Sequence, residues 1–128
     1  MNLIDVDNSF LLIIDIQDKL IKLIENRDEV INSAVTAVDI SQSLKLPVLC
    51  SEQYPKGLGK TINQIDLLLE NMNAKKISKT SFSCYDSIEN IKVINSFKKK
   101  QVIISGIETH ICVLQTAFDL KNNGYDVF

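Results

Sequence analysis

Apolar residues recur along this chain in two alternating patterns, short continuous runs and stripes with helical spacing. Continuous runs are typical of strands that are covered on both faces, whereas a period of 3.6 residues is typical of amphipathic helices. The runs predict strands at residues 10–16, 47–50, 76–79, 101–105 and 125–128. The stripes predict helices at residues 18–25, 28–44, 61–70, 86–98 and 112–120. Residues 51–60 contain Pro55, Gly57 and Gly59 and are expected to form a loop.

This alternation of strand and helix predicts the α/β class. Short apolar strands separated by helices favour a three-layer αβα architecture with a Rossmann-like, parallel, doubly wound sheet. We expect the strand order 3-2-1-4-5, because residues that end the first and fourth strands can meet only if those strands are neighbours. The chain of 128 residues is expected to form a single domain.

Three chemically unusual residues follow predicted strands. Asp15 interrupts the first apolar run near its carboxyl end, Lys79 ends the third strand, and Cys112 follows the fourth. Because the carboxyl ends of parallel strands share one edge of the sheet, these residues are expected to meet there. In such a site the ammonium would lower the pKa of the thiol, and the carboxylate would accept and return a proton. Taken singly, Asp15 is also compatible with a cap or loop partner, and Lys79 with a surface charge.

Cys112 lies where the fourth strand has turned into a helix. Free backbone N–H groups and the positive end of the helix dipole favour a thiolate in the first turn, which is where a nucleophilic cysteine would be placed. The alternative is a small buried cysteine that only packs. Cys50 and Cys84 are expected to be such packing or bystander residues, and His110 is expected to be an exposed turn residue.

Composition narrows the classes of partner. Hydrophobic residues make up 45% of the chain and charged residues 23%, with a net charge of -2, so neither nucleic acid nor an anionic membrane is an expected partner. No apolar run reaches transmembrane length, and the first residues do not form a signal peptide. Three cysteines without metal-type spacing predict reduced thiols in a cytoplasmic protein. One histidine leaves few histidine-based metal sites, and we expect no metal and no cofactor.

Four further side chains are placed to line a pocket at the predicted edge. They are expected to contact a small-molecule substrate, with an aromatic ring as an apolar wall. These residues are Gln17, Gln53, Tyr54 and Phe82. Because Asp15 places a charge in an apolar strand, Asp15→Asn is expected to raise stability slightly while it abolishes activity.

Three segments carry a family resemblance. Residues 12–17 (LIIDIQ), 79–83 (KTSFS) and 106–113 (GIETHICV) resemble the motif blocks of the isochorismatase-like cysteine hydrolases, and 51–59 (SEQYPKGLG) resembles the isochorismatase domain-containing proteins within that superfamily. The likeness extends from about residue 10 to residue 128. It implies a triad with Cys112 as nucleophile, Asp15 as general base and acid, and Lys79 as electrostatic partner. It also implies a cis peptide bond between Ile107 and Glu108, with the backbone N–H groups of Glu108 and Cys112 forming an oxyanion hole.

The resemblance carries two departures. The nicotinamidase branch binds a divalent metal near the second strand through Asp and His residues, and the corresponding segment here, residues 51–54, has no histidine. Family domains also continue beyond the fifth strand, so this domain is expected to be incomplete at its C-terminus, without a sixth strand. An exposed sheet edge and an uncovered apolar face favour self-association, and a homo-oligomer is the expected state.

Three functional hypotheses follow. The first is a hydrolase that cleaves an amide or related acyl bond of a small molecule through a Cys112 thioester. The second is vinyl-ether hydrolysis of an isochorismate-like substrate, in which Asp15 alone would be the acid and Cys112 would be dispensable. The third is a catalytically silent scaffold or interaction subunit that retains the triad as a remnant.

Overall fold

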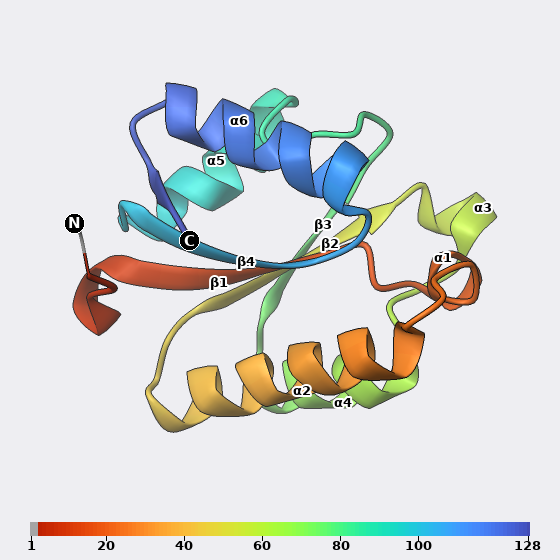
Figure 1. Ribbon diagram of the computed structural model, residues 1–128. Helices are drawn as coiled ribbons and strands as arrows, with labels where there is room; N and C mark the ends of the chain where they lie inside the picture. Colours follow the sequence, from red (N-terminus) through yellow and green to blue (C-terminus); the bar gives the residue numbers. More distant parts are fainter. Residues whose placement is uncertain (1–2) are drawn as a thin grey trace.

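Five parallel strands form one sheet in the order β3-β2-β1-β4-β5, which confirms the predicted topology. The computed structural model describes residues 3–128 (Figure 1). The strands are β1 (Ser9–Ile14), β2 (Val48–Gln53), β3 (Lys75–Lys79), β4 (Gln101–Gly106) and β5 (Asp126–Val127). β1 lies at the centre, between β2 and β4, so its carboxyl end adjoins the carboxyl ends of both neighbours.

Helices cover the sheet on both sides, as the αβα prediction requires. In Figure 1, α2 and α4 lie on one side of the sheet and α5 and α6 on the other. These helices are α2 (Arg27–Ser43), α4 (Asn63–Asn71), α5 (Ile88–Ser96) and α6 (Leu114–Asn122). The shorter helices are η1 (Val6–Asn8), α1 (Asp18–Ile21), α3 (Pro55–Leu58) and η2 (Thr109–Val113), of which η2 is a π-helix that leads directly into α6. No helix in the described part of the chain is both long and apolar enough to span a membrane.

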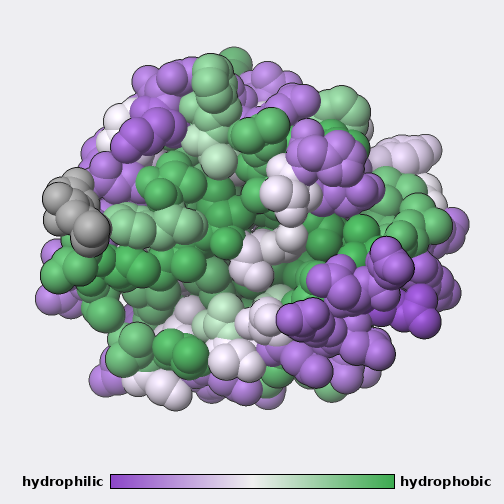
Figure 2. Space-filling model, viewed as in Figure 1, coloured by the Kyte–Doolittle hydropathy of each residue, from purple (hydrophilic) through white to green (hydrophobic). Residues whose placement is uncertain are grey.

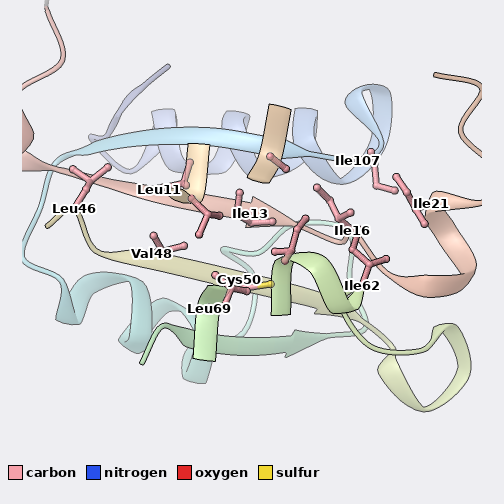
Figure 3. Packing of buried hydrophobic residues seen from close by; sticks show 13 residues of the cluster. Leu11, Ile13, Ile16, Ile21, Leu46, Val48, Cys50, Ile62, Leu69 and Ile107 are labelled. Atoms are coloured by element: carbon pink, nitrogen blue, oxygen red, sulfur yellow. The ribbon is translucent and has the colours of Figure 1, made fainter. Parts of the chain in front are cut away.

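The central strand β1 anchors two hydrophobic cores. All six of its residues are buried, and alternate side chains point to opposite faces of the sheet. Leu11 and Ile13 belong to the core beneath α2 and α4, part of which is shown in Figure 3. Leu12 and Ile14 belong to the core beneath α5 and α6. Burial of one such side chain stabilises a fold by ~1.5–3 kcal/mol, so this strand is fixed firmly between the layers.

The structure corrects the predicted loop at residues 51–60. Ser51, Glu52 and Gln53 continue β2, because they pair in register with Ile77, Ser78 and Lys79 of β3. The short helix α3 then follows. The sequence pattern had ended the strand at residue 50 because polar residues and the Pro and Gly signals come directly after it. Pairing with the neighbouring strand overrides that local signal.

Other element boundaries also differ from the prediction. The helix expected at 18–25 ends at Ile21. The next turns are closed by hydrogen bonds from the N–H groups of Leu23 and Ile24 to carbonyls three residues earlier. The helix expected from residue 61 begins at Asn63, because Thr61 forms an isolated antiparallel bridge with Gln17. The strand expected at 125–128 is reduced to β5, whose two residues pair with the first two of β4.

One face of the molecule leaves apolar side chains uncovered. Figure 2 shows hydrophobic residues gathered across the middle of the face where β4 and β1 lie in Figure 1. An apolar groove of about 220 Å³ lies on this side of the sheet, next to α2. It is lined by Ile4, Val6, Leu11, Ala37, Ile40, Ser41, Leu44, Leu46 and Ile103.

Candidate functional site

The candidate site begins where β1 ends. Asp15 is the first residue beyond the strand and has a left-handed backbone conformation, with φ of 55°. Its N–H donates to the carbonyl of Ser51 at 3.2 Å, which ties the turn to the end of β2. This sharp turn terminates the strand and leaves the Asp15 side chain fully buried.

Asp15 and Lys79 form a buried ion pair. The Nζ of Lys79, at the end of β3, lies 2.7 Å from Oδ2 of Asp15, and both side chains are 1% exposed. The ammonium also donates to Oε1 of Gln53 at 2.6 Å. The second carboxylate oxygen, Oδ1, accepts from the hydroxyl of Ser51 at 2.7 Å. Hydrogen bonds therefore fix both oxygens of the carboxylate and direct the ammonium.

Cys112 reaches the same pair from the other side of β1. It lies in η2, which follows β4, and its side chain interacts with the Asp15 carboxylate and the Lys79 ammonium. The connection passes through Gly106, which has φ of +143° and packs so closely on β1 that a Cβ there would lie 2.2 Å from the carbonyl oxygen of Ile14. Only glycine permits this approach. The structure thus brings together the three residues that the sequence pattern placed on one edge.

The charge state of the thiol corrects the expectation of a favoured thiolate. Burial, together with a hydrogen bond to Asp15 and the negative charge of that residue, raises the pKa of Cys112 to about 11, and Lys79 opposes the shift only in part. Burial and the adjacent carboxylate both disfavour the thiolate, and the one ammonium, which Asp15 shares, offsets them only in part. Cys112 is therefore a protonated thiol at rest, and a nucleophilic step requires a base to remove its proton.

The segment expected to form an oxyanion hole has the implied backbone geometry. The Ile107–Glu108 peptide bond is cis. The carbonyl of Glu108 accepts from the N–H groups of Ile111 at 3.1 Å and Val113 at 3.2 Å, which anchors the start of η2. Cys112 lies within this helical segment, three residues beyond its first residue, Thr109.

The four residues predicted to contact substrate have different environments. Gln17 is fully buried, and its amide bonds only to backbone groups: Nε2 donates to the carbonyls of Gln53 at 2.9 Å and Gly59 at 2.8 Å, and Oε1 accepts from the N–H of Gln53 at 2.6 Å. In this chain Gln17 braces the end of β2 and offers no surface to a ligand. Gln53 is half-buried and bonds Lys79, and Tyr54 and Phe82 are exposed.

A cleft of about 640 Å³ opens beside Lys79. Lys79 is the member of the buried cluster that lines it, and of the four predicted substrate-contact residues only Tyr54 does so. The rest of the lining is largely hydroxyl and amide groups, from Ser78, Thr80, Ser81, Ser87 and Asn90, together with Pro55, Lys56, Asp86 and Glu89. The exposed surface of the lining is nonetheless mostly apolar, and the cleft lies on the β3 side of the cluster, against Lys79.

Residues around the cluster include some that the sequence pattern did not single out. Ser51 was assigned to a loop, yet it bonds Asp15 directly. Cys84, predicted to be a bystander, is fully buried, and its sulfur interacts with the hydroxyl groups of Ser51 and Thr116. A hydroxyl residue directly after a buried strand, beside a strand that ends in Asp, is the signal that would have found Ser51. Cys50 packs in the core as predicted, and His110 is exposed as predicted.

The residues after β2 do not fit a divalent metal. Glu52, near the end of β2 itself, is the acidic residue of this region, and its Oε2 accepts from the N–H of Thr61 at 2.6 Å and from its hydroxyl at 2.9 Å. Within residues 3–128, no three His, Cys, Asp or Glu side chains are grouped as a metal site requires. Glu52 thus serves to hold the start of the segment that leads into α4.

Comparisons with known proteins identify the family of this chain. Residues 9–128 match the model of the isochorismatase domain. The isochorismatase family protein 1A of Dictyostelium discoideum is 41% identical over 125 residues, which cover 94% of this chain and 60% of that protein. The chain therefore spans about 60% of the length of this curated relative.

Solved structures share the fold. The MAR1 ribonuclease of Caenorhabditis elegans is 35% identical, with a TM-score of 0.87 over 97% of this chain and 62% of that one. An octameric Escherichia coli hydrolase of unknown specificity is 24% identical, with a TM-score of 0.90 over 98% of this chain and 62% of that one, a likeness of fold alone. With a family model that matches residues 9–128 and a relative that is 41% identical, this chain belongs to the isochorismatase family.

Proposed function

We propose that this chain carries the active site of a hydrolase that cleaves an amide or related acyl bond of a small molecule through a Cys112 thioester. The observation that supports the proposal is the convergence of a thiol, a carboxylate and an ammonium at the carboxyl edge of the sheet, with the Lys79–Asp15 pair at 2.7 Å and the sulfur of Cys112 against both. Family membership is consistent with hydrolysis.

Because the Cys112 thiol is protonated at rest, the first proton transferred in the proposed mechanism is that of the thiol. As the sulfur forms a bond to the substrate carbonyl carbon, the thiol proton passes to the Asp15 carboxylate, and the carbonyl oxygen becomes an oxyanion. The backbone N–H groups of Glu108 and Cys112 are the proposed donors to that oxyanion. Lys79 remains protonated and balances the charge of Asp15 throughout. It does so from a buried position, where its charge is little screened by water.

The remaining steps return the site to its resting state. When the tetrahedral intermediate collapses, the carbon–nitrogen bond breaks and Asp15 gives its proton to the leaving amine, which leaves a thioester on Cys112. Asp15 then takes a proton from water as the water oxygen attacks the thioester. Cleavage of the carbon–sulfur bond releases the acid, and the sulfur recovers the proton from Asp15. Atoms and charges balance without a metal or a redox partner.

The cleft beside Lys79 is the proposed place for the part of the substrate away from the reacting bond. Its lining exposes more carbon than polar surface, with hydroxyl and amide groups among it, which favours a compact, partly apolar group that carries a few hydrogen-bonding atoms. Tyr54, which is exposed at its rim, supplies a ring against which such a group packs. Phe82 and Gln53 are proposed to bound the reacting end of the substrate, because the side chain of Gln53 bonds the Lys79 ammonium.

A substitution of the nucleophile tests the covalent mechanism. Cys112→Ser is expected to lower turnover of the best amide substrate by about a thousandfold or more, since the hydroxyl is a poorer nucleophile than the thiol. Cys50→Ala, which changes a cysteine in the opposite core, is the matched control and should retain turnover in the folded fraction. Rapid acid quenching of the wild type should reveal an acyl group on Cys112 by mass spectrometry. Full turnover by Cys112→Ser would refute the thioester and favour the vinyl-ether alternative.

We also propose that the chain self-associates through its uncovered apolar face. Ile40 is 53% exposed at the groove next to α2, where apolar residues gather. A second copy is the proposed occupant, because contiguous apolar surface of this kind drives association. Sedimentation should show a dimer or larger species that Ile40→Asp shifts towards the monomer. Ile88→Asp, at a residue of α5 that is 68% exposed, should leave the assembly unchanged. A monomeric wild type would refute the proposal.

A further inference from the structure

Ser51 is the one hydroxyl that bonds the Asp15 carboxylate directly among the described residues. Its Oγ donates to Oδ1 at 2.7 Å, and both residues are fully buried. Its carbonyl also accepts from the N–H of Asp15 at 3.2 Å. Ser51 therefore holds the carboxylate of Asp15 with its side chain and the main chain of Asp15 with its backbone. Ser51 has no exposed surface and therefore cannot act as a ligand to substrate.

The surroundings of Ser51 direct its hydroxyl hydrogen towards Asp15. A serine has one hydrogen to donate and two lone pairs with which to accept. Because the Asp15 carboxylate can only accept, the Ser51 hydroxyl donates its hydrogen to Asp15, and the sulfur of Cys84 interacts with the same hydroxyl. Cys84 is held in turn by Thr116, whose Oγ1 accepts from the Cys84 N–H at 2.9 Å. This network links α6, the loop after β3 and the end of β2 behind the carboxylate.

We propose that Ser51 is a positioning residue that keeps Asp15 ionised and thereby sets the lowest pH at which Asp15 can accept the proton of Cys112. The proposal rests on the proposed function, in which Asp15 is the base. A donor to a carboxylate favours its charged form, and hydrogen bonds to charged groups are stronger than neutral ones. The charged or titratable groups that share this environment are Lys79 at the end of β3, Cys112 in η2, Cys84 in the loop after β3 and Cys50 in β2.

The pH dependence of the rate of Cys112 alkylation measures proton transfer between Cys112 and Asp15 without any substrate. Iodoacetamide reacts with the thiolate, and mass spectrometry of the peptide that contains Cys112 separates its reaction from those of Cys50 and Cys84. In the wild type, the alkylation rate should rise with pH as the Asp15–Cys112 pair loses its first proton, and then reach a plateau. The rising part of this profile is the acidic limb. Asp15→Asn should abolish this limb, because the partner carboxylate is gone.

Ser51→Ala should move the acidic limb to higher pH by about one unit and raise the plateau about tenfold, since a carboxylate without its donor is a stronger base. At pH values below the limb the rates should coincide, because both forms of the enzyme then carry a neutral Asp15. Ser51→Thr, which keeps the hydroxyl, should restore the wild-type profile. If the alanine variant does not fold, Ser51→Cys, with similar volume and a weaker donor, should shift the limb in the same direction.

Ser9→Ala is the matched control. Ser9 is also fully buried, and its hydroxyl donates to the Asp5 carbonyl at 2.6 Å at the opposite end of β1. The variant should lose stability without moving the limb, since limb position reports only on folded molecules. A Ser51→Ala profile that stays with the wild type and Ser9→Ala would overturn the role of Ser51 alone. A wild-type profile without an acidic limb would overturn the pairing of Asp15 with Cys112 as well.

Discussion

The buried pair of Asp15 and Lys79 makes the stability of the fold depend on two opposite charges being removed together. Asp15→Asn leaves the Lys79 ammonium, 1% exposed, without its anionic partner; its remaining contacts include Oε1 of Gln53 at 2.6 Å, the carbonyl of Ser81 at 3.4 Å and the side chain of Cys112. Loss of one partner from a buried ion pair costs ~3–5 kcal/mol. Because domains are stable by only ~5–15 kcal/mol, we expect Asp15→Asn to remove about a fifth or more of the free energy of unfolding.

This expectation is opposite to the slight stabilisation that the sequence pattern predicts for Asp15→Asn, because that pattern does not reveal the buried ammonium. Lys79→Met should be similarly costly, as it leaves the carboxylate with the Ser51 hydroxyl as its remaining strong donor. In the double variant Asp15→Asn/Lys79→Met neither charge is stranded. The loss should therefore be smaller than the sum of the two single losses by about 2 kcal/mol.

Equilibrium unfolding in urea measures all four proteins, provided that the slope against denaturant is common to them. The variants need no activity, so the assay is independent of substrate. Single losses below ~1 kcal/mol would show that water or a shifted side chain solvates the remaining charge. Losses that simply add would show that the 2.7 Å contact carries no coupling. Either outcome would refute the reasoning.

Three further outcomes are expected. The pKa of the Cys112 thiol is 9.0 in the unfolded chain and about 11 in the folded protein, so its contribution to stability is complete below pH 9 and should be lost as the pH rises towards 11. The free energy of unfolding in urea should therefore depend less on pH in this range for Cys112→Ser than for the wild type. Parallel pH profiles of the two proteins would contradict this. Gly106→Ala should cost about 2–3 kcal/mol in thermal unfolding, because its Cβ would meet backbone at 2.2 Å, whereas Gly124→Ala, with nothing within 4 Å, should cost less; equal losses would exclude the contact as the cause. Gln17→Leu should increase hydrogen exchange after β2, since it removes three hydrogen bonds to backbone there; unchanged exchange would show that the brace is dispensable.

The sheet was predictable because its signals are local. The run from Phe10 to Ile14 is apolar on both alternating faces, which only a strand between two layers requires, and the structure buries every one of these residues. The position of Asp15 at the end of that run, with Lys79 and Cys112 after later strands, then followed from strand order. The strand order places these three residues, which are far apart in the sequence, at one edge of the sheet.

The parts that escaped prediction depend on what lies across space. Ser51 belongs to β2 because it pairs with Ile14 of β1 and Ile77 of β3, and nothing in its local sequence overrides the turn signals that follow. The helix-start argument for Cys112 counted the dipole and Lys79 but could not weigh burial and a carboxylate in direct contact. Gln17 looked like a pocket residue because of its place after β1, yet the backbone groups of the next strand occupy its amide.

The register of β1 with its neighbours has a consequence for how the molecule folds. Ile14 pairs with Ser51 on one side and with Gly106 on the other, so the site is assembled from segments 36, 64 and more than 90 positions apart along the chain. No local stretch can preform it, and closing such loops is a slow, entropically costly part of folding. Ser51 should therefore reach Asp15 when β1 pairs with β2, and Lys79 and Cys112 only when the later segments dock, so a nascent chain should not react at this site before Cys112 is in place.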